Sequence, residues 1–163
     1  MRNMLIRLAA GAVGGAVATL LMTKSMPLAK KLPEKLRPQM PHRDPGDFMV
    51  SQGEKVVGPL SPKVHSGAAQ GLHWAYGMFW PLGLAALSEV LGLDTPGKRV
   101  AGGAVLGALC WFVGYEGWLP AAKLAPPAHR VPLAKNASGL ASHVAYGTIA
   151  SLPLAFAAPR FEA

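Results

Sequence analysis

Two short stretches of the chain bring together side chains that can do chemistry. The pattern His-x-Ala-Tyr-Gly begins at His73 and recurs at His143, and its tyrosines are Tyr76 and Tyr146. A histidine and a tyrosine three residues apart share one face of a helix. An imidazole titrates near neutral pH, so such a pair can carry a proton or sense pH. Both copies lie in apolar segments without Lys, Arg, Asp or Glu, where a polar pair is costly unless another group binds it.

Three interpretations of the two histidines are open on the sequence. The first is packing, in which each imidazole hydrogen-bonds to a Ser, Tyr or Glu on another helix. The second is a proton relay, for which Glu116, the one charged residue of another apolar segment, supplies the carboxylate. The third is haem, bound through His73 and His143 as its two axial ligands. We expect packing, and therefore no cofactor, because interhelical polar bonds are common in helical bundles.

The chain lacks the motifs of the common enzyme classes. It contains no Gly-rich phosphate loop followed by Lys-Ser or Lys-Thr, no His-Glu-x-x-His and no Gly-x-Ser-x-Gly. Cys110 is the only cysteine, which excludes an internal disulfide and a metal site made of several cysteines. It lies among apolar residues, where a thiol acts as a small hydrophobe. We therefore predict that the protein is not an enzyme and holds no metal.

The composition is typical of a membrane protein. Hydrophobic residues make up 51% of the 163 residues and charged residues 15%, against about 25% charged in a soluble domain. Gly and Pro are frequent, as they are in membrane helices. The net charge is +8, and the basic residues flank apolar segments, which suits contact with anionic lipid headgroups. No nucleic-acid-binding motif accompanies this charge, so we expect no nucleic acid partner.

Four apolar segments position the two motif copies, and they predict an all-α protein with four transmembrane helices. As helices, each is long enough to cross a bilayer core of about 30 Å: residues 5–26, 64–88, 100–122 and 136–158. Pro81 should kink the second segment, and Pro120 should end the third. For the first segment a cleaved signal peptide is the alternative, because a basic start and an apolar run are its marks.

A long Pro-rich loop, residues 27–63, separates the first two segments. Residues 28–36 are expected to form a short basic amphipathic piece that lies on the headgroups. Residues 44–47, Asp-Pro-Gly-Asp, are typical of a turn followed by a helix start, and a short helix is expected over residues 48–57. Whether the whole loop is ordered stays open.

The two halves of the chain share one pattern. Gly-Ala-Val occurs at Gly11 and again at Gly103, and in both halves a proline, a basic apolar stretch, a loop and a motif copy follow. We therefore predict a single membrane domain made of two tandem hairpins, residues 1–91 and 92–163. Two spans in each unit make the repeat parallel, with the two motif histidines at similar depths. The match between the first and third segments argues that the first is retained rather than cleaved.

Each half also carries a Gly-x-x-x-Gly step in its first segment. Gly11 pairs with Gly15, and Gly103 pairs with Gly107. Such steps form flat helix faces that allow close approach of two backbones. We expect these faces to pack the first and third segments together at the centre of the bundle.

Lysines and arginines are unequally divided between the two ends of the predicted bundle. Of the sixteen, eleven fall in the loops after the first and third segments and five fall on the side of the termini. The positive-inside rule then places the Pro-rich loops in the cytoplasm. We expect a multi-pass protein of the bacterial inner membrane that contacts anionic headgroups and forms a homo-oligomer or a subunit of a membrane complex.

A linear pattern between about residue 70 and residue 150 resembles the YagU-like family of small bacterial inner-membrane proteins. The residues that carry it are His73, Glu89, Glu116, Pro120, Leu124, Pro126-Pro127, Pro132, Asn136, Ser138, Ser142-His143 and Tyr146-Gly147. The resemblance implies a four-helix inner-membrane protein with a role in acid stress.

Three functions are compatible with these patterns. We expect a structural or accessory membrane protein, attached as a small subunit to a larger complex. The alternative is a proton-linked transport or acid-stress protein that uses His73, His143 and Glu116. A membrane subunit that binds haem through both histidines is the third.

Overall fold

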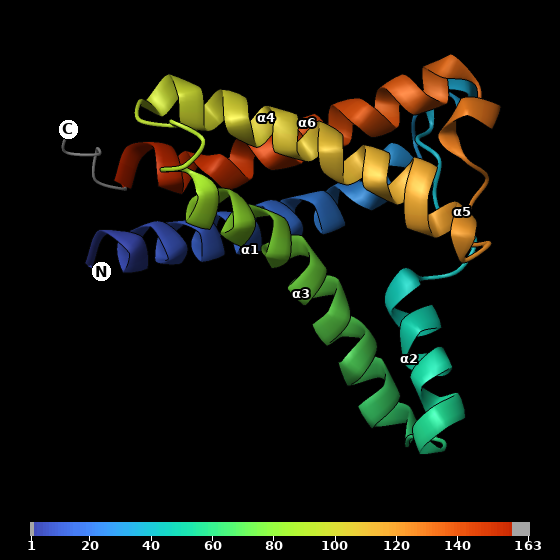
Figure 1. Cartoon of the computed structure of the whole chain (residues 1–163). Coiled ribbons are helices and arrows are strands. Elements are labelled where there is room, and N and C mark those ends of the chain that lie inside the picture. Colours follow the sequence, from blue (N-terminus) through green and yellow to red (C-terminus); the bar gives the residue numbers. More distant parts are fainter. Residues whose placement is uncertain (1, 158–163) are drawn as a thin grey trace.

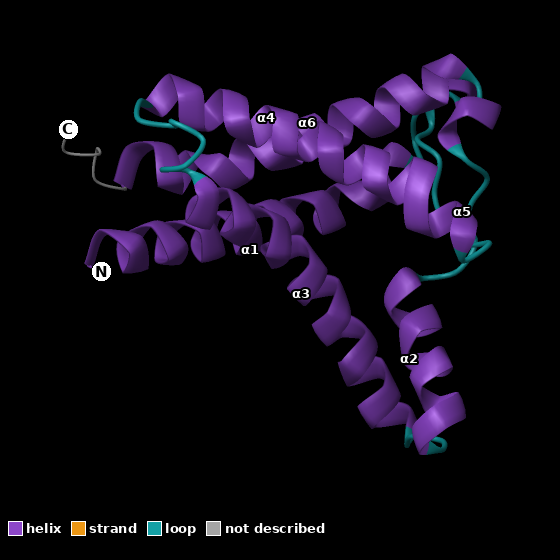
Figure 2. Ribbon diagram, in the orientation of Figure 1, coloured by secondary structure: helices purple, strands orange, loops and turns teal. Residues whose placement is uncertain are grey.

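The computed structural model describes residues 2–157, which form helices and loops but no strand (Figure 1, Figure 2). This confirms the predicted all-α class. The elements in chain order are α1 (Arg2–Ala29), η1 (Glu34–Leu36), α2 (Pro45–Val57), α3 (Pro62–Leu87), α4 (Pro96–Phe112), η2 (Val113–Trp118), α5 (Leu119–Ala121), η3 (Ala128–Arg130) and α6 (Leu133–Ala157). Of the short elements, η1 and η3 are 3-10 turns and η2 is a π-helical turn.

The four apolar segments all form long helices. They correspond to α1, to α3, to α4 continued by η2 and α5, and to α6. The predicted end of the last segment at residue 158, and Arg160 beyond it, lie outside the described residues. By length and composition, Asn3–Ala29 and Pro96–Ala121 are apolar enough to cross a membrane. Membrane crossing by α3 and α6 stays a prediction.

Helix starts follow a common local rule in this chain. Asp44, Ser61 and Thr95 cap α2, α3 and α4, and each stands directly before a proline. Each side-chain oxygen accepts the backbone N–H three residues on, at 2.9, 3.5 and 3.3 Å. Proline suits the first helical position because an N–H there would have no partner within the helix. The turn and short helix predicted for residues 44–57 are thereby confirmed.

The basic amphipathic piece predicted for residues 28–36 does not form as one element. The first helix ends at Ala29, and only the three residues of η1 are helical after it. Pro33 separates the two, because it has no N–H and disfavours helical backbone at Leu32. The lysines of this stretch are exposed, as expected.

The helices α1, α4 and α6 run alongside one another, and the N-terminal half of α3 diverges from them (Figure 1). The helix α6 packs against both α1 and α4, and α3 packs against α1. The start of α1, the end of α6 and the loop from α3 to α4 lie at one end of the bundle, and both Pro-rich loops lie at the other (Figure 1). The C-terminal half of α3 follows α1, whereas its N-terminal half diverges and forms an arm with α2 (Figure 1).

Small residues dominate the interior of the bundle. Ala18 and Ala150 meet Tyr146 where α1 packs on α6, and Ala85 of α3 is completely buried. Most large apolar side chains point outward, as Val105 does with 68% of its surface exposed, although Leu84 and Leu154 lie in the core. The buried residues also include five polar or charged ones: Arg7, Thr19, Ser88, Arg99 and Ser151.

Candidate functional site

The glycine of each motif copy is a point of helix contact. A Cβ atom added to Gly77 on α3 would overlap the hydroxyl of Thr19 on α1. A Cβ atom added to Gly147 on α6 would overlap the backbone of α4 at Gly103 and Gly107. The pattern shared by the two copies therefore ends in a residue that must be small for two helices to touch.

The four glycines of the Gly-x-x-x-Gly steps pack closely, but not with each other. Gly11 and Gly15 lie against the backbone of α3, and Gly103 and Gly107 lie against the backbone of α6. The prediction that the first and third segments pack together through these faces is therefore wrong. Each glycine step packs inside its own hairpin, because the second helix of the hairpin offers a small motif glycine at the matching height.

Tyr146 joins the two hairpins at the centre of the bundle. Its side chain is 5% exposed, and its hydroxyl donates a hydrogen bond to the backbone carbonyl of Gly77 on α3. That carbonyl lacks its usual partner in the helix, since the residue four positions on is Pro81, which has no N–H. A neighbouring helix can satisfy a carbonyl freed by proline. The phenol of one motif copy thus completes the backbone bonding of the other.

Tyr76, the counterpart of Tyr146, has different surroundings. It is partly exposed, and its ring meets Trp80 and Trp118 edge to face, with centroids 6.1 and 6.2 Å away. Its hydroxyl accepts a weak hydrogen bond from the thiol of Cys110 at 3.9 Å. The second hairpin has Ser151 where the first has Pro81, so the carbonyl of Gly147, unlike that of Gly77, has an N–H four residues on; the proline of α6 is Pro153 instead.

Each motif histidine bonds inside its own hairpin. His73 Nε2 lies 3.0 Å from the hydroxyl of Thr23 on α1. His143 Nδ1 donates to the carbonyl of Gly139 on its own helix at 2.9 Å, and the ring of Tyr115 meets the imidazole edge on. Among residues 2–157, no hydrogen bond joins the two histidines.

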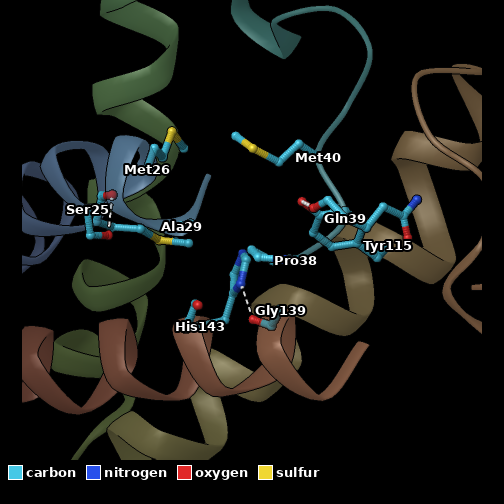
Figure 3. A pocket seen from close by; sticks show the side chains of 11 residues that line it. Ser25, Met26, Ala29, Pro38, Gln39, Met40, Tyr115, Gly139 and His143 are labelled. Atoms are coloured by element: carbon cyan, nitrogen blue, oxygen red, sulfur yellow. Dashed lines mark hydrogen bonds between the residues drawn. The ribbon is translucent and has the colours of Figure 1, made fainter. Parts of the chain in front are cut away.

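His143 also lines a cleft between α1, α6 and the first Pro-rich loop. The cleft is about 60 Å³ in volume, and Met26, Gln39 and Met40 form part of its wall (Figure 3). His73 does not line it. A bis-histidine haem site needs both imidazoles to face one space. This cleft is not such a space, and haem binding through both histidines stays a hypothesis.

Glu116 lies at the Pro-rich end of the bundle and pairs with a loop histidine. One carboxylate oxygen accepts the backbone N–H of His129 at 2.7 Å, and the other lies 2.8 Å from His129 Nδ1. The proton-relay hypothesis made Glu116 a partner of His73 or His143, and this assignment is wrong. Sequence reasoning missed His129 because it stands in a loop without any motif spacing.

Two buried arginines were also missed. Arg7 Nη2 lies 2.7 Å from the carboxylate of Glu89, which follows α3. Arg99 donates hydrogen bonds to the carbonyls of Leu93 and Leu154 at 2.9 and 3.0 Å. A sequence signal exists, because each arginine stands four residues before the first glycine of a Gly-x-x-x-Gly step. That spacing places both on the packed face of their helices.

An ion network that sequence reasoning did not find joins α2 to α3. His65 on α3 holds Asp47 through Nε2 at 2.8 Å and Glu54 through Nδ1 at 3.2 Å, and Arg43 binds Asp47 at 2.5 Å. Carboxylates only accept hydrogen bonds, so His65 makes both bonds when both of its ring nitrogens carry protons. The hydrogen bonds to Asp47 and Glu54 raise the pKa of His65, and the bonds from His65 and Arg43 lower the pKa of Asp47.

The contacts of the motif side chains are mainly contacts between helices. The motif tyrosines, histidines and glycines contact neighbouring helices, and in residues 2–157 no group of three or more His, Cys, Asp or Glu could hold a metal ion. No family model, curated protein or solved structure matches the chain. The resemblance to the YagU-like family therefore stays a prediction.

Proposed function

We propose that the chain is a small integral membrane protein of structural or accessory type, attached as a subunit to a larger complex of the bacterial inner membrane. The observation that carries this proposal is the distribution of side chains by size. Small residues lie between the helices, and large apolar residues lie on the outside.

This distribution is the reverse of that in a bundle that folds in water. There, each helix buries its large apolar side chains and exposes polar ones. In lipid the hydrocarbon tails are as apolar as leucine, so helices associate through small residues and interhelical hydrogen bonds. The outward apolar residues of the two helices that are long and apolar enough to cross a membrane include Val13, Val17, Leu20, Leu21, Val105, Leu109 and Phe112. They support a lipid environment around α1 and α4, and we extend it to α3 and α6, which pack on them.

Matching contacts support the proposal of two tandem hairpins. Gly11 packs on Pro81 in the first hairpin, and Gly103 packs on Ser151 in the second. Pro81 and Ser151 each stand eight residues after the histidine of their motif copy. The two hairpins therefore use the same register between their helices, as a duplicated unit would.

The proposed topology has four membrane crossings, with the Pro-rich loops in the cytoplasm. In α3 the proposed crossing begins after Gln70 rather than at residue 64, which leaves residues 71–87, close to the lower limit of about 17 residues for a span. The residues before it include Lys63 and Gln70, which are exposed, and His65, which is bound to α2. This first part of α3 then lies with α2 at the membrane surface.

An accessory role is favoured over proton-linked transport by the bonding of the polar groups. A transport path needs ionisable side chains that face a common aqueous space. His73 bonds to Thr23, His143 bonds to its own helix, and Glu116 bonds to a loop residue. These contacts hold helices and loops in place, so the geometry adds no support for the transport hypothesis.

The membrane placement is tested by extraction and by labelling from either side. Alkaline carbonate should leave the protein in the membrane pellet. In a Cys110→Ala background, Asp94→Cys should react with an impermeant maleimide in intact spheroplasts, and Lys31→Cys should react only after lysis. Reaction of both cysteines from the same side would overturn the proposed topology.

The accessory role is tested by native purification in a mild detergent, with the mass of the complex measured. We expect one partner subunit at fixed stoichiometry, and we expect the double variant His73→Ala, His143→Ala to lose it. His129→Ala, which changes a histidine outside the bundle, should keep it. If the protein instead purifies alone and reconstituted vesicles show a proton flux that depends on His73 and His143, the protein is a transporter and the accessory role is refuted.

A further inference from the structure

The side of α2 that packs on α3 carries the ion network together with the buried Gly46 and Val50. Asp47 and Glu54 hold His65 between them, and Arg43 binds both Asp47 and Ser51, at 2.5 and 2.6 Å. These groups lie at the contact between the two helices. The ion network therefore holds α2 on the first part of α3, and the two form one arm.

The outward side of α2 is mainly apolar, with Gln52, which accepts a hydrogen bond from Lys55, as its polar residue. Met49, Gly53 and Val56 follow one another at spacings of four and three residues, so they form a single stripe along the helix. Met49 is 51% exposed and Val56 is 86% exposed. Exposed apolar residues continue around the tip of the arm. We define the arm face by its residues: Met49, Gly53, Val56, Val57, Leu60 and Val64.

The arm lies at the end of the bundle where both Pro-rich loops lie. In Figure 1 α2 runs across the direction of α1, α4 and α6 at that end. Phe48, near the start of α2, packs against Leu119, Leu124 and Ala125 of the loop region after α4. If the bundle crosses a bilayer, α2 therefore runs along its surface rather than through it.

Two lysines flank the arm face. Lys55 lies beside the apolar stripe on α2, and Lys63 lies at the start of α3, and both are exposed. An apolar stripe bordered by lysines is the pattern of a helix that lies in the headgroup layer of an anionic membrane. The apolar side chains reach the acyl boundary, and the long lysine side chains reach the headgroups.

We propose that the arm face is a membrane-surface contact that binds the anionic headgroup layer of the bilayer that the bundle crosses. The inference rests on the proposed membrane placement of the bundle. A second copy of the chain fits the arm face less well, because it would place its own Lys55 and Lys63 close to these two lysines, where like charges repel. Anionic lipid offers negative headgroups to the two lysines and an apolar acyl layer to the apolar side chains of the arm face.

The experiment places a fluorescent label at three positions in a Cys110→Ala background, in vesicles of phosphatidylcholine with phosphatidylglycerol. Val56→Cys reports on the arm face, Val105→Cys on the outward face of α4, and Glu34→Cys on the exposed η1 within the first Pro-rich loop. Lipids brominated on their acyl chains quench a label that lies in the bilayer. We expect quenching at Val56→Cys and Val105→Cys, and none at Glu34→Cys.

The contribution of the lysines is tested by changing which lipid carries the bromine. Quenching at Val56→Cys should be a few-fold stronger with brominated phosphatidylglycerol than with brominated phosphatidylcholine, since each lysine near the surface attracts anionic lipid. The double change Lys55→Gln, Lys63→Gln should abolish this preference and leave the quenching by phosphatidylcholine. At Val105→Cys the two lipids should quench alike before and after the change.

The outcomes separate the arm from the bundle. If the label at Val105→Cys is quenched and the label at Val56→Cys is as exposed to water as that at Glu34→Cys, the arm proposal is overturned while the membrane placement stands. If neither is quenched, the membrane placement itself fails. If the label at Val56→Cys is shielded from water but not quenched by lipid, and the protein is dimeric, then a second copy covers the arm face and the lipid proposal is refuted.

Discussion

The hydroxyl of Tyr146 on α6 takes the place of a missing backbone N–H on α3 by donating to the carbonyl of Gly77. The N–H is missing because Pro81 stands four residues after Gly77. A side chain of the second hairpin therefore completes the backbone bonding of the first. This bond connects the two motif copies directly, and it gives the tyrosine of the second copy a structural task that Tyr76 does not share.

Removal of this hydroxyl should destabilise the bundle in a way that depends on Pro81. The change Tyr146→Phe leaves the half-buried carbonyl of Gly77 without a donor and should lower the free energy of unfolding by about 1–3 kcal/mol. The change Pro81→Ala restores an N–H within α3, so Tyr146→Phe should cost much less in that background. A double-mutant cycle of unfolding in detergent micelles measures the difference. Equal costs in the two backgrounds would show that the phenol does not serve the Gly77 carbonyl.

The motif glycine should be intolerant of even one methyl group. Gly77→Ala puts a Cβ atom onto the hydroxyl of Thr19, and overpacking of this kind costs about 1–3 kcal/mol. Gly83 on the same helix has no atom within 4 Å of the place where its Cβ would lie. Gly83→Ala should therefore be neutral or should stabilise the helix by up to about 1 kcal/mol. Unfolding in the same micelles compares the two, and a similar loss in both variants would contradict the contact.

The helices could be predicted from the sequence because the signals for them are local. Long apolar runs end at polar loops, and pairs such as Ser61-Pro62 and Thr95-Pro96 mark helix starts. Which helix packs against which other helix could not be predicted in this way. A Gly-x-x-x-Gly face can pack against any helix that offers a small residue. In this chain Gly77 and Gly147 are those small residues, and each belongs to the same hairpin as the face that it contacts.

The polar site could be predicted only in part, for a related reason. The motif residues are visible in the sequence because they repeat, and the structure does place their glycines at helix contacts. The partners of Glu116 and His65 depend on how a Pro-rich loop folds back and on how α2 lies against α3. No local pattern encodes those distances, so His129 and Asp47 could not be named as partners beforehand.

The buried Arg7 should depend on its carboxylate partner more than a surface pair does. Glu89→Gln weakens the hydrogen bond to a buried guanidinium and should lower the free energy of unfolding by about 1 kcal/mol. Lys98 and Asp94 form an exposed pair one helical turn apart, and Asp94→Asn should have no effect beyond the scatter of the measurement. Both variants can be unfolded at low and high salt. Part of the Glu89→Gln effect should persist at high salt, because the Arg7 end of the pair is buried and screened less, although Glu89 itself is 62% exposed.

The closure of α2 on α3 should depend on pH through His65. The pKa of His65 is raised by its bonds to Asp47 and Glu54, so its contribution is complete below the usual histidine value of about 6.5 and is lost as the pH rises through the raised value. The pKa values of Asp47 and Glu54 are lowered, so their contributions are lost only as the pH falls through the lowered values. The protection of α2 amides from hydrogen exchange, corrected for the intrinsic rate at each pH, should therefore be greatest between about pH 4.5 and 6.5.

A histidine outside the network supplies the matched control for this profile. His65→Gln removes the titrating group, so the loss of protection on the alkaline side should disappear and α2 should be less protected throughout the acidic range. His42 lies in the loop before α2 and bonds to Leu124 only through its backbone N–H. His42→Gln should therefore leave the profile unchanged. If α2 keeps the same alkaline loss of protection in His65→Gln, then the closure of the arm is set by groups other than the imidazole between Asp47 and Glu54.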